Sequence, residues 1–258
     1  MNMQILLSAV GLACVATVAT VAHADDAQKY SLADLKALVE QKSYLEAVQH
    51  LGDIAPAQRT GEWIELAGAA SAGAVAGAEA DAKLGYMIEI EKMYPNVLKS
   101  PKYVAVRTDA AKPAFDGCFR RRHAFQDCHD AALKFVDADV KNAKLTLDVA
   151  KAVRLGMSHY SAVPFFKRAH AAGGKAVCKD EDLKLAVISG LGLPDKDTRL
   201  EEAIGLTYAC FDDMKAPILK ELTADSGYFH DRACDLLASR RVPLPADKER
   251  LCAAPRKK

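Results

Sequence analysis

Cysteines are the residues of this chain with the most chemistry to offer. There are seven. Cys14 lies in an apolar run near the N-terminus, and the other six follow much later: Cys118, Cys128, Cys178, Cys210, Cys234 and Cys252. Six thiols could form three disulfides, hold a metal or supply a nucleophile. An even set in an exported chain favours disulfides, although many connectivities are formally open.

The N-terminal segment predicts export. Ile5 to Ala22 contains no charged residue, and Ala22-His23-Ala24 has small residues where an export peptidase cleaves. We therefore expect residues 1–24 to be a signal peptide and the mature protein to be periplasmic or secreted, with no transmembrane span. Two alternatives stay open: lipid attachment at Cys14, which would make the protein a lipid-anchored envelope component, and an uncleaved membrane anchor.

Helix order suggests how the cysteines pair. Cys178 precedes one predicted helix and Cys210 ends the next, and antiparallel packing would bring these ends together. The same reasoning pairs Cys234 with Cys252 on two successive short helices. Cys118 and Cys128 flank a compact corner and form the third expected bridge. Cysteines outside the cytosol usually oxidise, so we expect disulfides.

The sequence favours disulfides over metal, haem or catalytic roles for these cysteines. Cys118, His123, Cys128 and His129 give the spacing C-x4-H-x4-C-H, whose donors suit tetrahedral zinc, but the spacing matches no zinc motif that we can defend. A haem motif C-x-x-C-H would need a cysteine where Phe125 stands. A catalytic cysteine needs an unpaired thiol. We expect no metal and no cofactor.

The corner between Cys118 and Cys128 is a possible interface. It contains Phe119, Arg120, Arg121, Arg122 and Phe125. Three arginines could bind a phosphate, a carboxylate or an acidic partner, and an exposed aromatic ring would add apolar contact. The sequence favours the other interpretation, a solvated helix end whose arginines complement backbone carbonyls, unless Phe119 or Phe125 is exposed beside them.

Signatures of catalysis are missing. His129-Asp130 and His230-Asp231 are the only histidine–acid neighbours worth naming, and no G-x-S-x-G, G-x-G-x-x-G or H-E-x-x-H occurs. Near-adjacent acids such as Glu89 and Glu91 are expected to face solvent. We therefore expect a protein that is not an enzyme.

Composition and capping signals predict an all-α protein. Half of the residues are hydrophobic and the net charge is +1, which favours a folded chain and argues against a nucleic-acid partner. Ser31-Leu-Ala-Asp34 and Ser43-Tyr-Leu-Glu46 each match a capping box that opens a helix. The second helix should end at Pro56. The stretch Gly68 to Gly77 is rich in small residues and could let two helices approach closely, or form a flexible linker.

Two internal repeats organise the chain. An apolar pattern returns after 39 residues, in the pairs Leu45/Leu84, Val48/Met87, Leu51/Ile90, Ile54/Met93 and Pro56/Pro95. A second pattern returns after 38 residues, in the pairs Leu145/Leu183, Leu147/Leu185, Val149/Val187, Val153/Leu191 and Leu155/Leu193. Helices are expected to follow at 162–171 and 198–210, and further ones at 226–239 and 247–252. Such periods are typical of stacked helical hairpins.

These patterns resemble two repeat families. Tyr44-x-x-Ala47-x-x-x-Leu51-x-x-x-x-Pro56 is similar to the second helix of a tetratricopeptide repeat, although the Trp-Leu-Gly-Tyr signature of the first helix is absent. Residues 145–171 and 183–210 look like HEAT-type helix pairs. The resemblance implies a right-handed α-solenoid of stacked helical hairpins that binds another protein on a concave surface.

We therefore expect a signal peptide (1–24), tetratricopeptide-like hairpins (25–112) and HEAT-like repeats with three disulfides (113–258). The expected function is a non-enzymatic scaffold in the cell envelope whose partner is an envelope or secreted protein. The alternative is a periplasmic hydrolase or ligand-binding protein with a site in the concave groove, built from His129, His159 or His230 with carboxylates.

Overall fold

The structure is a computed structural model that describes residues 30–80, 82–121, 125–223 and 227–253. Within these ranges the chain forms helices and no strand, which confirms the all-α prediction. The expected signal peptide and Cys14 lie outside the described residues. The α-helices are α1 (Leu32–Glu40), α2 (Tyr44–Gln49), α3 (Gly61–Gly77), α4 (Lys83–Met93), α5 (Pro101–Arg120), α6 (Phe125–Asp137), α7 (Ala143–Gly156), α8 (Val163–Gly173), α9 (Glu181–Leu191), α10 (Thr198–Ala209), α11 (Phe211–Glu221), α12 (Tyr228–Ser239) and α13 (Ala246–Ala253).

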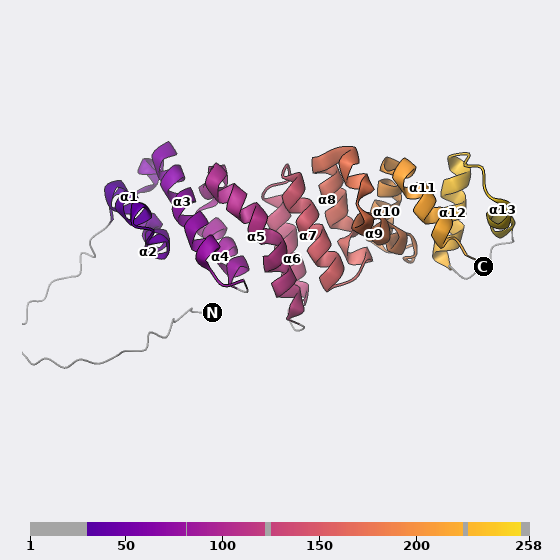
Figure 1. The fold of residues 1–258 in the computed structure, drawn as a ribbon, viewed down its shortest axis with the longest axis horizontal. Helices are drawn as coiled ribbons and strands as arrows, with labels where there is room; N and C mark the ends of the chain where they lie inside the picture. Colours follow the sequence, from indigo (N-terminus) through magenta and orange to yellow (C-terminus); the bar gives the residue numbers. More distant parts are fainter. Residues whose placement is uncertain (1–29, 81, 122–124, 224–226, 254–258) are drawn as a thin grey trace, which may run out of the picture.

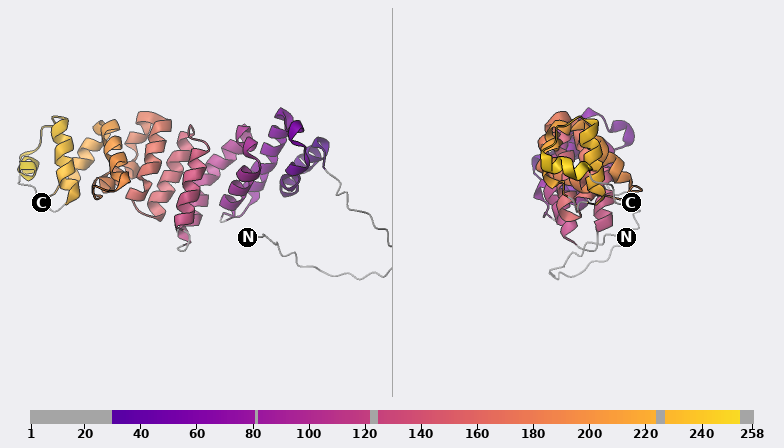
Figure 2. Two further views of the ribbon diagram at one scale, coloured as in Figure 1. Left: turned by 180° about the vertical axis from the view of Figure 1, so that it is seen from behind. Right: turned by 90° about the vertical axis from the view of Figure 1, so that its right-hand side faces the viewer.

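Short 3-10 segments connect several of these helices: η1 (Leu51–Asp53), η2 (Pro56–Gln58), η3 (Pro95–Lys99), η4 (Tyr160–Ala162) and η5 (Gly174–Lys179). The α-helices follow one another along the long axis of the molecule in chain order, from α1 at one end to α13 at the other (Figure 1). Seen end-on, the same helices overlap in a narrow profile (Figure 2). A buried apolar cluster runs through the stack from Leu35 to Leu237.

The first two helices begin differently. At α1 the Ser31 hydroxyl accepts from the backbone N–H of Asp34, and the Asp34 carboxylate accepts from the N–H of Ser31, which is the predicted capping box. Ser43 makes no such cap, and α2 ends at Gln49, well before Pro56.

The predicted apolar face of α2 is wrong at one position, because Leu45 is 51% exposed. Pro56 begins η2, where its missing N–H costs no helical hydrogen bond.

The small residues of α3 form a helix, so the linker alternative is wrong. A Cβ atom added to Gly73 would lie 2.3 Å from the ring of Tyr44 in α2. One added to Gly68 would lie 2.2 Å from the Cβ of Ser100, just before α5. The predicted close approach is therefore present on two sides of α3, since only glycine leaves room for these neighbours.

The long helix α5 crosses the expected boundary between residues 112 and 113 without a break, with Pro113 inside it. It packs against α3 on one side and α7 on the other. A linker is therefore not present at this boundary, and the apolar cluster is continuous across it.

The 38-residue repeat coincides with α7 and α9. The pairs Leu145/Leu183, Val149/Val187 and Val153/Leu191 are buried in both helices. The flanking positions are less regular, because Leu155 is 61% exposed and Leu185 is 43% exposed. Helices α8 and α10 follow as expected, whereas α11 was not predicted. Among the described helices, none is long and apolar enough to cross a membrane.

Candidate functional site

All three expected disulfides are present. Cys118–Cys128 joins the last turn of α5 to the first turn of α6, with Cα atoms 5.9 Å apart. Cys178–Cys210 joins η5 to the end of α10, and Cys234–Cys252 joins α12 to α13. Such bonds persist in oxidising compartments, so they suggest a location outside the cytoplasm.

The bridge between Cys118 and Cys128 argues against the alternative in which these two cysteines hold zinc. A cysteine binds zinc as a thiolate, and both of these sulfurs are covalently paired with each other. His123 lies outside the described residues. His129 packs its ring edge against Phe165, with centroids 5.3 Å apart.

The disulfide also shapes the corner that the sequence singled out. It ties the end of α5, where Arg120 lies, to the start of α6, where Phe125 lies. Phe125 is 38% exposed. The prediction that Phe119 is an interface residue is wrong, because its side chain is 3% exposed. Gly156 at the end of α7 allows this burial: a Cβ atom there would lie 2.2 Å from the Cβ of Phe119.

A groove of about 550 Å³ lies at this corner, between the end of α5, the start of α6 and the end of α7. We call it the corner groove. Phe125 and the largely exposed Leu155 give it an apolar lining. Its lining residues are Asp116, Phe119, Arg120, Phe125, Ala152, Leu155 and Gly156. Leu155 was not among the predicted site residues, because its place in the 38-residue repeat suggested burial.

Arg120 gives the corner groove a positive charge that no described acid pairs with. Arg120 is exposed and donates from Nε to the backbone carbonyl of Asp116 at 3.2 Å. Arg121 is also exposed. Within the described ranges neither guanidinium forms an ion pair, and the Asp116 carboxylate is paired with Lys112 at 2.7 Å. Arg122 lies outside the described residues.

A larger groove of about 790 Å³ lies between α8 and α10. It is lined by cations, but each has an acidic neighbour. Lys167 lies 3.1 Å from Glu202, Arg168 lies 2.7 Å from Asp137, and Arg199 lies 2.6 Å from Asp197. These pairs reduce the attraction that this groove could exert on an anion.

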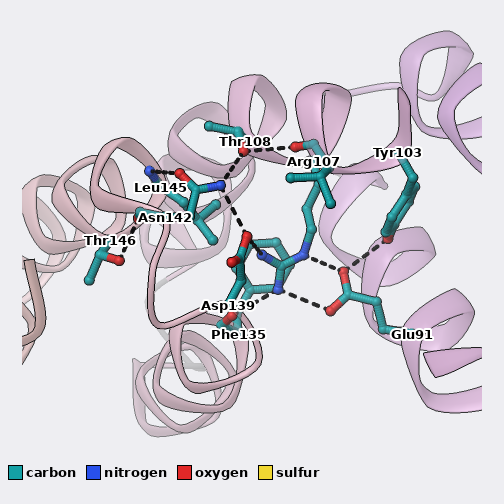
Figure 3. A network of polar contacts seen from close by, with 10 residues as sticks. Glu91, Tyr103, Arg107, Thr108, Phe135, Asp139, Asn142, Leu145 and Thr146 are labelled. Atoms are coloured by element: carbon teal, nitrogen blue, oxygen red, sulfur yellow. Dashed lines mark hydrogen bonds and ion pairs between the residues drawn. The ribbon is translucent and has the colours of Figure 1, made fainter. Parts of the chain in front are cut away.

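Arg107 is a charged side chain that the protein buries completely, and its site is not apparent from the sequence. Its side chain is fully buried in α5, and Nε and Nη2 donate to the two carboxylate oxygens of Glu91 in α4, at 2.7 and 3.0 Å. Nη2 also donates to the carbonyl of Phe135 in α6 at 2.8 Å, and the guanidinium lies 3.6 Å from the centroid of the Phe135 ring. Arg107 therefore links three helices (Figure 3).

The network extends on both sides of Arg107. Tyr103 donates its hydroxyl to Glu91 Oε1 at 2.9 Å, and burial together with the Glu91 charge raises the pKa of that hydroxyl far above its ordinary value. On the other side Asn142 donates to Thr108 and caps α7 by accepting from Leu145 N–H (Figure 3). The expectation that Glu91 faces solvent is wrong, since its side chain is 12% exposed. A groove of about 560 Å³ is lined by Glu91 and Phe135, but not by Arg107. Because the guanidinium is fully buried and holds three helices together, we read this network as structural.

The histidines named for the enzyme alternative make separate contacts. His129 Nδ1 lies 3.6 Å from Asp130, His159 Nε2 lies 3.4 Å from Arg154 Nη1, and His230 Nε2 lies 3.2 Å from the carbonyl of Leu251. The helices α6 and α12, which carry His129 and His230, lie well apart along the stack (Figure 1). The structure therefore does not bring these three side chains into one site.

Comparison of the chain with protein-family models, with curated proteins and with solved structures finds no match. The likeness to tetratricopeptide and HEAT repeats therefore rests on helical pattern alone.

Proposed function

We propose that this protein is an exported, non-enzymatic helical-repeat scaffold that binds another envelope or secreted protein at the corner groove. The observation that carries this proposal is that Arg120, which forms no ion pair with any described residue, lines the groove together with the exposed apolar side chains of Phe125 and Leu155. The exposed Arg121 follows Arg120 in the chain. Arginine and aromatic residues are the side chains that most often dominate the affinity of protein interfaces.

The arrangement of the helices supports a repeat scaffold. They follow in chain order along one axis (Figure 1), and three apolar pairs of the 38-residue repeat are buried alike in α7 and α9. In a right-handed α-solenoid each hairpin contacts its neighbours, and binding residues are presented on the surface of the stack. Export to the periplasm or the cell exterior is supported by the three disulfides.

The chemistry of the corner groove defines the partner. Arg120 in the lining and Arg121 next to it in the chain would attract carboxylates, and a guanidinium can hold a carboxylate by two parallel hydrogen bonds. Phe125 and Leu155 would bury an apolar side chain beside them. We therefore expect the partner to present a short segment that combines acidic residues with a leucine or an aromatic residue.

A peptide-display selection on the purified, oxidised protein tests this function. Enriched peptides should contain at least two acidic residues near one large apolar residue. Loss of a buried anchor costs about 2 kcal/mol or more at the centre of an interface. Phe125→Ala and Leu155→Ala should therefore each weaken binding of a selected peptide by at least about tenfold.

Leu45→Ala is the matched control, because Leu45 is also a half-exposed leucine but lies in α2, near the N-terminal end of the stack and away from the corner groove. It should leave the affinity unchanged. Enrichment of peptides without acidic residues, or equal affinities for the wild-type, Phe125→Ala and Leu155→Ala proteins, would contradict the proposal.

A further inference from the structure

The Cys178–Cys210 bridge has a histidine beside it. His170 lies in the last turn of α8, Cys178 in η5 directly after that helix, and Cys210 at the end of α10. One ring nitrogen of His170 and the two sulfurs lie within 4.8 Å of one another. Among the described residues, this is where three histidine, cysteine or acidic side chains converge closely enough to share a metal ion.

The imidazole of His170 has an unused nitrogen. Nε2 is buried and forms no hydrogen bond with any described residue. A buried polar atom without a partner costs free energy, so such an atom in a folded protein calls for an explanation such as an absent ion. Both cysteines are also buried, at 1% and 2% exposure.

We propose that the Cys178–Cys210 bridge, once reduced, becomes a binding site for a thiophilic metal ion such as Zn²⁺, with His170 as the third ligand. Reduction by a dithiol supplies two electrons. The S–S bond breaks, each sulfur takes up a proton, and the dithiol becomes a disulfide. Metal binding then displaces both thiol protons, and the thiolates and the neutral imidazole coordinate the ion.

The geometry needs only small movements. Metal–sulfur bonds of about 2.3 Å and metal–nitrogen bonds of about 2.0 Å put the donors of a tetrahedral site roughly 3.5–3.8 Å apart. Breaking the S–S bond frees the sulfurs to separate by side-chain rotation, and the Cα atoms are already 5.2 Å apart. Two thiolates and one imidazole form a donor set that suits Zn²⁺ or Cu⁺.

Access to the site comes from the groove between α8 and α10. His170 lines that groove, together with Leu206 and Ala209, which lie in the turn that precedes Cys210. A water molecule from the groove could complete the tetrahedron, since a three-ligand site leaves one position open.

Alkylation mapping tests the proposal. The protein is reduced with a water-soluble phosphine, which is oxidised to its oxide and offers no competing thiol. It is then treated with a thiol-alkylating reagent with and without Zn²⁺, and each cysteine is followed by mass spectrometry. Zn²⁺ should protect Cys178 and Cys210 while the other cysteines, among them Cys118, Cys128, Cys234 and Cys252, react as before. Circular dichroism checks that the helices are retained, or are restored by Zn²⁺.

Three variants sharpen this test. Loss of an outer-shell partner already costs about 10- to 100-fold in metal affinity, so removal of a ligand in His170→Ala should cost at least as much. His170→Cys supplies another zinc ligand and should restore protection. His129→Ala removes the histidine next to Cys128 and should leave protection unchanged. Three outcomes would each overturn the proposal. Zn²⁺ could protect all the cysteines equally, or it could still protect Cys178 and Cys210 in His170→Ala. The reduced chain could also lose its helices and not regain them with Zn²⁺.

Discussion

Arg107 and Glu91 form a two-pronged ion pair between α5 and α4, with Nε–Oε1 at 2.7 Å and Nη2–Oε2 at 3.0 Å. The guanidinium is fully buried and the carboxylate nearly so. Removing one partner of a buried pair leaves the other charge without compensation, which costs more than the intact pair contributes. Because removing one partner costs more than the intact pair contributes, single substitutions at this pair are a sensitive test of how α4 and α5 are held together.

Arg107→Met should lower the free energy of unfolding by about 3 kcal/mol, because it leaves the Glu91 carboxylate unpaired in a mostly buried place. Tyr103→Phe removes only one hydrogen bond to Glu91 and should cost about 1 kcal/mol. The double variant Arg107→Met/Glu91→Leu should recover part of the loss. Urea unfolding at neutral pH measures all three. A loss below about 1 kcal/mol in Arg107→Met would mean that the pair does not anchor these helices.

Gly73→Ala should destabilise the protein by about 1–3 kcal/mol, because the new methyl group would overlap the ring of Tyr44 and force α2 and α3 apart. The control is Gly85→Ala in α4, where an added Cβ atom meets nothing within 4 Å. That variant should be neutral or stabilising by up to about 1 kcal/mol, as expected for alanine in a helix. Thermal unfolding compares the two, and equal effects would contradict the close packing of α3.

Reduction of all three disulfides should lower the midpoint of thermal unfolding strongly. Chain entropy gives about 3 kcal/mol for each closed loop, against a typical total stability of about 5–15 kcal/mol. The separation of 32 residues between Cys178 and Cys210 is the largest, and that of 10 residues between Cys118 and Cys128 is the smallest. Cys178→Ser/Cys210→Ser should therefore cost more than Cys118→Ser/Cys128→Ser. A midpoint that reductant leaves unchanged would refute the stabilising role.

Asp197 caps the N-terminus of α10 by accepting from the backbone N–H of Arg199 at 3.0 Å, and acid should weaken this cap. Hydrogen bonds from the Arg199 guanidinium, at 2.6 and 2.9 Å, lower the pKa of the Asp197 carboxyl. A lowered folded-state pKa means that Asp197 stabilises the fold above its ordinary pKa of about 3.9 and loses this effect as pH falls through the lowered value. The free energy of unfolding of the wild type should exceed that of Asp197→Asn by the full amount at neutral pH, and this difference should disappear in acid. A difference independent of pH would contradict this.

Peptide binding at the corner groove should depend on salt and on the nearby disulfide. Raising the ionic strength to about 1 M, where the Debye length is roughly 3 Å, should weaken binding because it screens Arg120 and Arg121. Cys118→Ser/Cys128→Ser should also weaken it, because the bridge fixes the end of α5 against the start of α6. Fluorescence anisotropy with a selected peptide measures both effects. If the affinity changed neither with ionic strength nor with loss of the disulfide, the peptide would bind outside the corner groove.

The sequence by itself determined the all-α class, the cap at Ser31 and the three disulfide pairings. These follow from short-range signals: hydrophobic spacing, a side chain that reaches its own backbone three residues away, and cysteines at the ends of successive helices. Most of the buried face of α7 and α9 was predictable for the same reason, because one face of a helix repeats along the chain.

Only the tertiary structure decided what happens between distant helices. No pattern in the sequence around Arg107 predicts its contacts with Glu91 and Phe135, because the three residues meet only through the packing of α4, α5 and α6. Likewise, the exposure of Leu155 and the burial of Phe119 depend on where α7 ends against α5. The approach of His170 to Cys178 and Cys210 has the same origin. Periodicity assigns a side chain to a face of its helix, but the neighbouring helices decide whether that face is covered.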